Sequence, residues 1–125
     1  MAEHADGRAA NPFESVLRNV ALDVPGLVLV PQVIVAESPE LRPDLVDPVR
    51  RVVAEADSFA WHGSRSALRR DCRRYNRLAL LDYVVLRFSW EDVMHDPGYV
   101  RAVLVDTVRV VEARAQRAVR RRKTA

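Results

Sequence analysis

Three short runs rich in β-branched residues constrain the fold of this chain more than any other feature. The runs are LVLV at 27–30, RRVV at 50–53 and YVVLRF at 83–88. Runs of this kind predict strands, and their density of β-branched residues is typical of a sheet covered by helices. Because 125 residues suffice for one domain of two packed layers, we expect a single α/β domain.

A first helix is predicted before the first run. Asn11 suits the N-cap, Pro12 suits the first helical position, and Glu14 stands three residues after the cap, as a capping box requires. Apolar residues then recur at helical spacing, which predicts a helix over 12–23 with one buried stripe.

The extended segments predict the sheet. The run at 27–37 contains Pro31, which cannot donate to a ladder, so this strand is expected to be bulged or at an edge. Segments 44–47 and 51–57 are separated by the turn residues 48–50 and predict a hairpin. The run at 83–88 completes a sheet of about four strands.

Two further helical segments complete the element order αβββαβα. The first is expected over 64–81, with an apolar stripe formed by Leu68, Cys72, Tyr75 and Ala79. Ser89 can cap a short helical turn, and Asp96 followed by Pro97 begins a last helix. That helix is expected to carry Val100, Val103, Leu104, Val108 and Val111 to the core.

The domain is expected to occupy residues 11–115, between a flexible lead-in at 1–10 and a basic tail at 116–125. Twenty Lys and Arg against seventeen Asp and Glu give a net charge of +3. Residues 117–125 hold five of these basic residues and no acidic one, so the remainder sums to 15 − 17 = −2. The tail, which is expected to fray, therefore accounts for most of the basic character and adds at most a non-specific attraction to nucleic acid.

Several protein classes are excluded by composition. No apolar run approaches the ~18 residues of a membrane span, and the first ten residues lack the apolar core of a secretory signal. One cysteine and three scattered histidines offer neither a disulfide nor a zinc-ligand pattern. We expect a cytoplasmic protein without a membrane partner or a small-molecule organic cofactor.

The predicted hairpin brings acidic residues together. If it turns symmetrically about Val49 and Arg50, cross-strand partners have numbers that sum to 99, so that Asp44 faces Glu55. Asp57, two residues beyond Glu55, projects from the same face. Three carboxylates on one face repel each other unless a cation neutralises them, one stays protonated, or the face is open to water. A half-exposed hairpin with a solvated polar face is the alternative without a function.

Six fragments of the chain, spread over residues 11–115, resemble a known family. They are NPFES from Asn11, PQV from Pro31, RPDLVDP from Arg42, EADSFAWH from Glu55, RDCRRYN from Arg70 and VLRFSWEDV from Val85. Their order is similar to that of the very short patch repair endonucleases, and closer still to the bacterial domain-of-unknown-function 559 family. Both belong to the PD-(D/E)XK nuclease superfamily, so the resemblance implies a restriction-endonuclease-like mixed sheet flanked by helices, and a Mg²⁺ or Mn²⁺ cofactor.

The resemblance also implies roles for individual residues. Metal ligation falls to Asp44, Glu55 and the backbone carbonyl of Ala56, and further catalytic positions to Glu14, His62 and Asp57. His62 would act as acid or base, or steady a phosphate. Asp57 stands where the family motif has a lysine, which removes the positive group that orients the attacking water.

Simpler roles exist for some of these residues. Glu14 suits a capping box, and His62 taken alone suits an ordinary loop. The six arginines at 64–77 suit a solvated helix face, with Asp71 pairing with Arg74 one turn on. Because that helix begins just after His62, phosphate contacts are also expected from its exposed arginines, namely Arg65, Arg69 and Arg73.

Three functions from different classes follow. The first is a metal-dependent endonuclease that hydrolyses DNA phosphodiester bonds, in DNA repair or defence. The second is a catalytically inactive, DNA-binding or antitoxin-like regulatory module that keeps the nuclease fold, which Asp57 at the lysine position favours. The third is a protein-interaction domain that uses the apolar face of the last helix, which a homodimer would bury.

Overall fold

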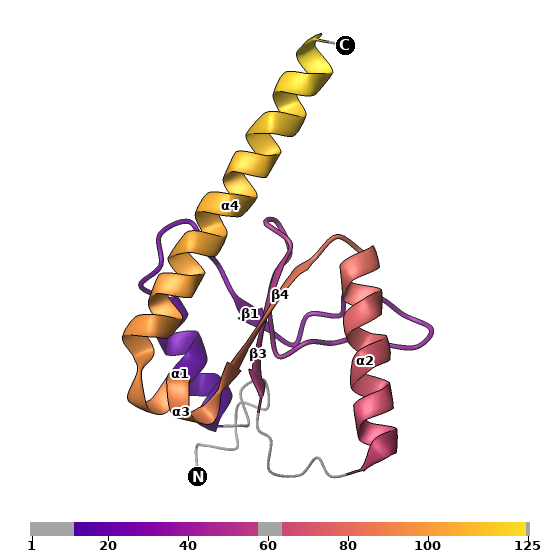
Figure 1. Ribbon diagram of the computed structural model, residues 1–125, viewed down its shortest axis with the longest axis vertical. Coiled ribbons are helices and arrows are strands. Elements are labelled where there is room, and N and C mark those ends of the chain that lie inside the picture. Colours follow the sequence, from indigo (N-terminus) through magenta and orange to yellow (C-terminus); the bar gives the residue numbers. More distant parts are fainter. Residues whose placement is uncertain (1–11, 58–63, 125) are drawn as a thin grey trace.

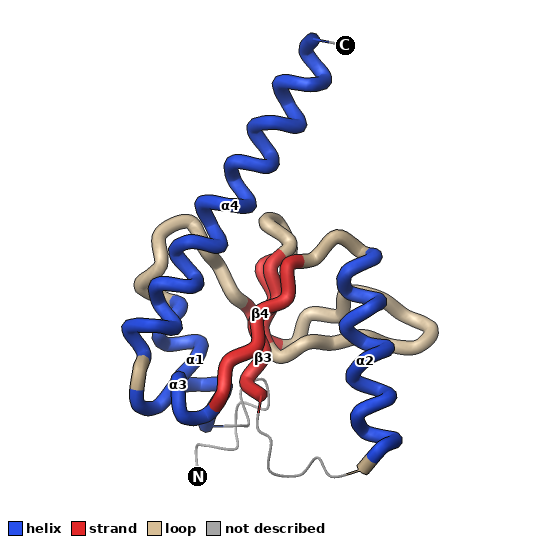
Figure 2. The backbone as a smooth tube through the Cα atoms, in the orientation of Figure 1, coloured by secondary structure: helices blue, strands red, loops and turns tan. Residues whose placement is uncertain are grey.

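The computed structural model describes residues 12–57 and 64–124, which form a mixed four-stranded sheet between two helical layers (Figure 1). Helices α1, α3 and α4 cover one face, and α2 covers the other (Figure 2). The elements are α1 (Pro12–Ala21), β1 (Val30–Pro31), β2 (Leu45–Asp47), β3 (Val52–Asp57), α2 (Arg65–Leu80), β4 (Val84–Ser89), α3 (Trp90–His95) and α4 (Pro97–Thr124). The predicted α/β class and the mixed sheet of four strands are confirmed, and the short turn after Ser89 is the separate helix α3.

The strand order is β1-β2-β3-β4, antiparallel except for the parallel pair β3 and β4. Leu45 pairs with Ala54, and Asp47 with Val52, so the partners sum to 99 and the predicted hairpin register is confirmed. β1 lies at an edge, as Pro31 predicted, but it has only two residues instead of the expected 27–37. Gln32 has a positive φ of 64°, which turns the chain away from the sheet directly after Pro31.

The core on the three-helix face joins sheet and helices that are distant in sequence. Val52 and Ala54 of β3 pack there against apolar residues of α1, α3 and α4. In α4 the side chains of Val100, Leu104 and Val108 are buried, as the sequence predicted. These three side chains of α4 are therefore covered by other elements of the same chain.

On the opposite face, α2 is rotated from its predicted orientation. Leu68 of the expected stripe is 64% exposed, and Cys72 is also exposed. The residues turned inward are Leu78, which is fully buried, and the half-buried Arg74 and Tyr75. The rotation has a physical cause, because the sheet face below α2 carries the buried acid Glu55, which needs polar partners rather than Leu68.

Helix α4 continues to Thr124, so the residues of the expected basic tail up to Thr124 are helical and continue the last helix of the domain. The packed turns of α4 supply the helix nucleus, and the Ala and Arg residues that follow are strong helix formers. The last turns extend beyond the body of the domain (Figure 1). Neither α4 nor any other helix of the described part combines the length and apolarity that crossing a bilayer demands.

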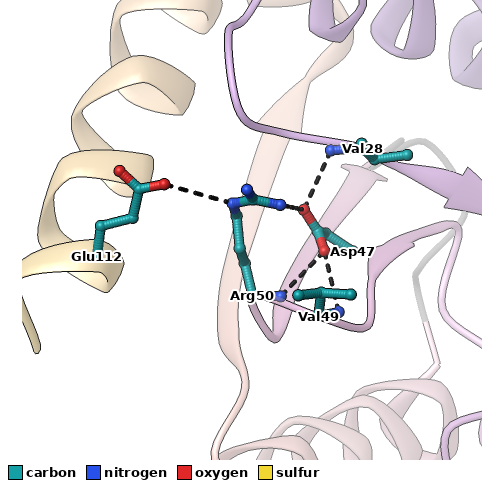
Figure 3. Close-up of polar contacts among 5 residues, drawn as sticks. All are labelled: Val28, Asp47, Val49, Arg50 and Glu112. Atoms are coloured by element: carbon teal, nitrogen blue, oxygen red, sulfur yellow. Dashed lines mark hydrogen bonds and ion pairs between the residues drawn. The ribbon is translucent and has the colours of Figure 1, made fainter. Parts of the chain in front are cut away.

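The hairpin is fixed by Asp47, whose side chain is buried at the end of β2 (Figure 3). Its Oδ1 accepts the backbone N–H groups of Val49 and Arg50 at 3.0 Å, and its Oδ2 accepts that of Val28 at 3.1 Å. The Arg50 guanidinium donates to Asp47 at 3.3 Å and lies 3.7 Å from Glu112 of α4. One carboxylate thus ties the turn to the segment before β1 and, through Arg50, to α4.

Candidate active site

Three carboxylates from three different elements interact near the end of β3. They belong to Glu14 in the first turn of α1, Asp44 just before β2, and Glu55 in β3. The hairpin register ends with the pair Leu45 and Ala54, and Asp44 and Glu55 are the next residues on the two sides. The charge of Glu55 acts on Asp44. The Ala56 N–H donates to Asp44 Oδ2 at 3.0 Å, which fixes the Asp44 carboxylate against β3. The fold therefore brings together three of the four acidic residues that the sequence selected, Glu14, Asp44 and Glu55.

Glu14 and Asp44 also line a small polar hollow of about 220 Å³. Gln32, Arg42 and Pro43 form the rest of its wall. Arg42 donates to Gln32 Oε1 at 2.6 Å and lies on the same side as the acids. The hollow thus combines carboxylates with one guanidinium, a set of groups suited to a hydrated or phosphate-bearing ligand.

The carboxyl groups of Glu14 and Asp44 share a hydrogen bond. Burial, the charge of Asp44 and this hydrogen bond raise the pKa of Glu14 from its usual 4.5 to about 7. Burial and the charge of Glu55 raise the pKa of Asp44, although the hydrogen bonds from Ala56 and Glu14 act in the opposite direction. Because burial disfavours two charged carboxylates side by side, this pair holds a shared proton more tightly than free carboxyl groups would.

Glu55 has a different environment, because two side chains of α2 compensate its burial. The Arg74 guanidinium holds both carboxylate oxygens, at 3.2 and 2.9 Å, and the Tyr75 hydroxyl donates to Oε1 at 2.9 Å. Burial alone would raise the pKa of Glu55, but the hydrogen bonds and charge of Arg74 outweigh it and lower the pKa. Glu55 is therefore held ionised beside a neighbouring pair that shares a proton.

Asp57, expected in the same acidic patch, is paired with a cation instead. Its carboxylate lies 2.8 Å from the guanidinium of Arg87 in β4. Arg87 also lies over the ring of Tyr75, 4.4 Å from its centroid. At the position where the family motif has a lysine, the chain therefore presents a carboxylate neutralised by an arginine of the next strand.

The structure places the other predicted site residues as follows. Arg65, Arg69 and Arg73 lie on the exposed side of α2, and His62 lies outside the described residues. Within 12–57 and 64–124, no group of three or more His, Cys, Asp or Glu side chains is arranged to hold a metal ion.

Sequence reasoning missed the residues that complete the site, Arg74, Tyr75 and Arg87. Physical chemistry offered one indication of these residues: a buried acid in a central strand requires a hydrogen-bond donor from the helix that covers it. Arg74 and Tyr75 lie in that helix, but the apolar stripe predicted for α2 directed Leu68 inward. In the sequence, Arg87 is one polar residue within an apolar strand, and nothing there indicated which acid it would pair with.

The raised pKa of Glu14 predicts a pH-dependent stability. The folded state binds this proton more tightly than the unfolded state, so the free energy of unfolding falls as the pH rises from about 4.5 to 7. Allowing for the partial exposure of Glu14, we expect a fall of about 1 kcal/mol. Glu55 has a lowered pKa, so its contribution to the free energy of unfolding is lost only at pH values below the usual pKa of a glutamate.

Urea unfolding between pH 5 and 8 measures this dependence. The Glu14→Gln variant keeps the shape of the side chain but cannot ionise, so its stability should vary less with pH than that of the wild type. Equal slopes in the two proteins would show that Glu14 ionises as freely as in the unfolded chain.

Comparisons with known proteins give relatives without an assigned activity. Two proteins of Mycobacterium tuberculosis, the uncharacterized protein Rv2248 of strain H37Rv and the uncharacterized protein MT2308 of strain CDC 1551, are each 34% identical to this chain over 102 residues. The match covers 78% of this chain and 37% of each relative, so the chain spans little more than a third of their length. No family model and no solved structure matches the chain.

Proposed function

We propose that this domain is a metal-dependent endonuclease of the PD-(D/E)XK type, with a restriction-endonuclease-like fold, that hydrolyses DNA phosphodiester bonds in cytoplasmic DNA repair or defence. The mixed sheet with helices on both faces and the six family-like fragments support this class. The proposal depends above all on one observation, the convergence of Glu14, Asp44 and Glu55 from three elements.

The electrostatics of this group favour a cation. Asp44 and Glu14 have raised pKa values because burial and the charge of Glu55 penalise the charged forms of both carboxyl groups. A divalent cation would relieve that penalty, and metal binding would displace the proton that the pair shares. Burying several acids without such a role would be costly.

The donor set fits magnesium, although the described residues form no three-ligand group. Magnesium takes oxygen ligands and keeps several waters, so one or two carboxylates suffice. Asp44 and Glu55 would hold the ion. When bound, it would supply an activated water and neutralise charge on the phosphate. Arg74 keeps Glu55 ionised and fixes both of its oxygens.

A cleavage assay tests the proposal. The full chain is incubated with linear, nicked, mismatched and single-stranded DNA in Mg²⁺, Mn²⁺ or EDTA. Cleavage of at least one substrate that requires the metal is expected. Intact DNA in all metal conditions would refute the enzymatic function.

One observation favours the second candidate, a catalytically inactive DNA-binding or antitoxin-like module. Glu55 is engaged on both oxygens by Arg74, and Asp57 at the lysine position is bound to Arg87. Such ion pairs are typical of acidic residues that stabilise the fold and bind no metal. This module would bind DNA without cleaving it in any metal.

A further inference from the structure

The last turns of α4 form a strongly basic surface that the candidate site does not use. Residues 113–124, here called the basic arm, contain six basic residues and no acidic one. They are Arg114, Arg117, Arg120, Arg121, Arg122 and Lys123, and all six are exposed. Within the described part of the chain, none of these six side chains forms an ion pair.

The arm is held in a defined position relative to the body. It continues α4 without interruption, and the first half of that helix is anchored by the buried Val100, Leu104 and Val108. Figure 1 shows the arm extending past the sheet, away from the end where α1 and α3 lie. Twelve helical residues span about 18 Å, so the basic side chains have fixed spacings along a helix.

The charges of the arm are arranged unfavourably for an isolated helix. Arg117 lies one turn from both Arg120 and Arg121, and Arg120 lies one turn from Lys123. Like charges three or four residues apart on a helix repel each other. A bound polyanion would convert this repulsion into attraction.

The spacing of the arginines suits a phosphate backbone. Arg114, Arg117 and Arg121 follow one another at three- and four-residue intervals, so they form a stripe along about 10 Å of the helix. Duplex DNA carries one phosphate per about 1.7 Å of its axis, so several phosphates lie within that distance. Five of the six basic residues are arginines, whose planar guanidinium matches phosphate oxygens bidentately.

We propose that the basic arm binds the phosphate backbone of duplex DNA, as a contact surface remote from the carboxylates. An anionic membrane fits less well, because interfacial helices bury large apolar side chains. The arm offers only Ala113, Ala115, Ala118 and Val119. The proposed contacts are made to phosphates and not to base edges. The arm would therefore increase the affinity for DNA without recognising its sequence.

The test measures the salt dependence of DNA binding by the full chain in EDTA, where hydrolysis plays no part. For a duplex of about 20 base pairs, fluorescence anisotropy between about 50 and 200 mM NaCl gives the slope of log K against log salt. The variant R117Q/R121Q should reduce the magnitude of that slope by about 2, since each lost phosphate contact contributes about 0.9. Glutamine is a good helix former, so circular dichroism should show the same helix content.

The control variant R101Q/R109Q removes the same charge from the packed half of α4, where both side chains are exposed. Its slope should equal that of the wild type. Equal slopes for both variants, no DNA binding by the wild type, or arm-dependent binding to phosphatidylserine vesicles without DNA binding would each overturn the proposal. An inactive enzyme that shows the expected slope change would refute the proposed hydrolysis and leave the arm's role standing.

Discussion

If the domain is the proposed nuclease, replacing Asp44 by asparagine should lower metal-dependent DNA cleavage by about 10²- to 10³-fold or more, because the change removes one of the two carboxylates proposed to hold the ion. The fold should survive. An asparagine side chain has nearly the same shape as the aspartate and keeps an oxygen that can accept the Ala56 N–H. The substitution also removes a charge that Glu55 repels, so thermal stability should be unchanged or higher.

The matched control is Glu91→Gln, which removes an exposed acid from the first turn of α3. Cleavage by this variant should equal that of the wild type. Cleavage by Asp44→Asn at the rate of the wild type would show that Asp44 is not part of the active site. Unfolding of Asp44→Asn would instead assign the residue a structural role.

The largest loss of stability is expected for Asp47→Ala. The substitution leaves the N–H groups of Val28, Val49 and Arg50 without their acceptor, and it takes an ion-pair partner from the Arg50 guanidinium. Several unsatisfied groups at a buried position should lower the free energy of unfolding by about 3–5 kcal/mol. Urea unfolding with an unchanged m value measures the loss.

Two variants keep this prediction decisive. Asp106→Ala removes an exposed acid whose ion pair with Arg109 is also exposed, so its effect should stay below about 0.5 kcal/mol. Asp47→Asn keeps one carbonyl oxygen and should lose less than Asp47→Ala. Equal stability of Asp47→Ala and Asp106→Ala would show that the turn does not depend on the carboxylate.

The sequence predicted those parts of the fold that local chemistry determines. The position of the turn sets the register of a short hairpin, so the residue numbers alone sufficed to place Asp44 opposite Glu55. The edge position of β1 followed from the missing N–H of Pro31, and the start of α4 from Asp96 and Pro97. These features depend on residues close together in the chain.

What the sequence did not predict depends on contacts between distant elements. Tyr75 is turned inward, as its place in the predicted stripe implied, but the rotation of α2 is set by Glu55 of β3, which also draws Arg74 inward. Hydrophobic periodicity takes account only of the residues of the helix and not of the sheet beneath it, so it assigned Leu68 to the core. The neutralisation of Asp57 by Arg87 likewise arises only once β3 and β4 are paired. The acids of the site were therefore predictable, and their cationic partners were not.

The two borders of the sheet differ in their capacity to accept another strand. On one side β1 has only two residues, one of which is a proline without an amide hydrogen, and the backbone turns away at Gln32. On the other side β4 is six residues long and, among the described residues, pairs with β3 alone. Among the described residues, the border at β4 therefore leaves far more strand length unpaired than the border at β1.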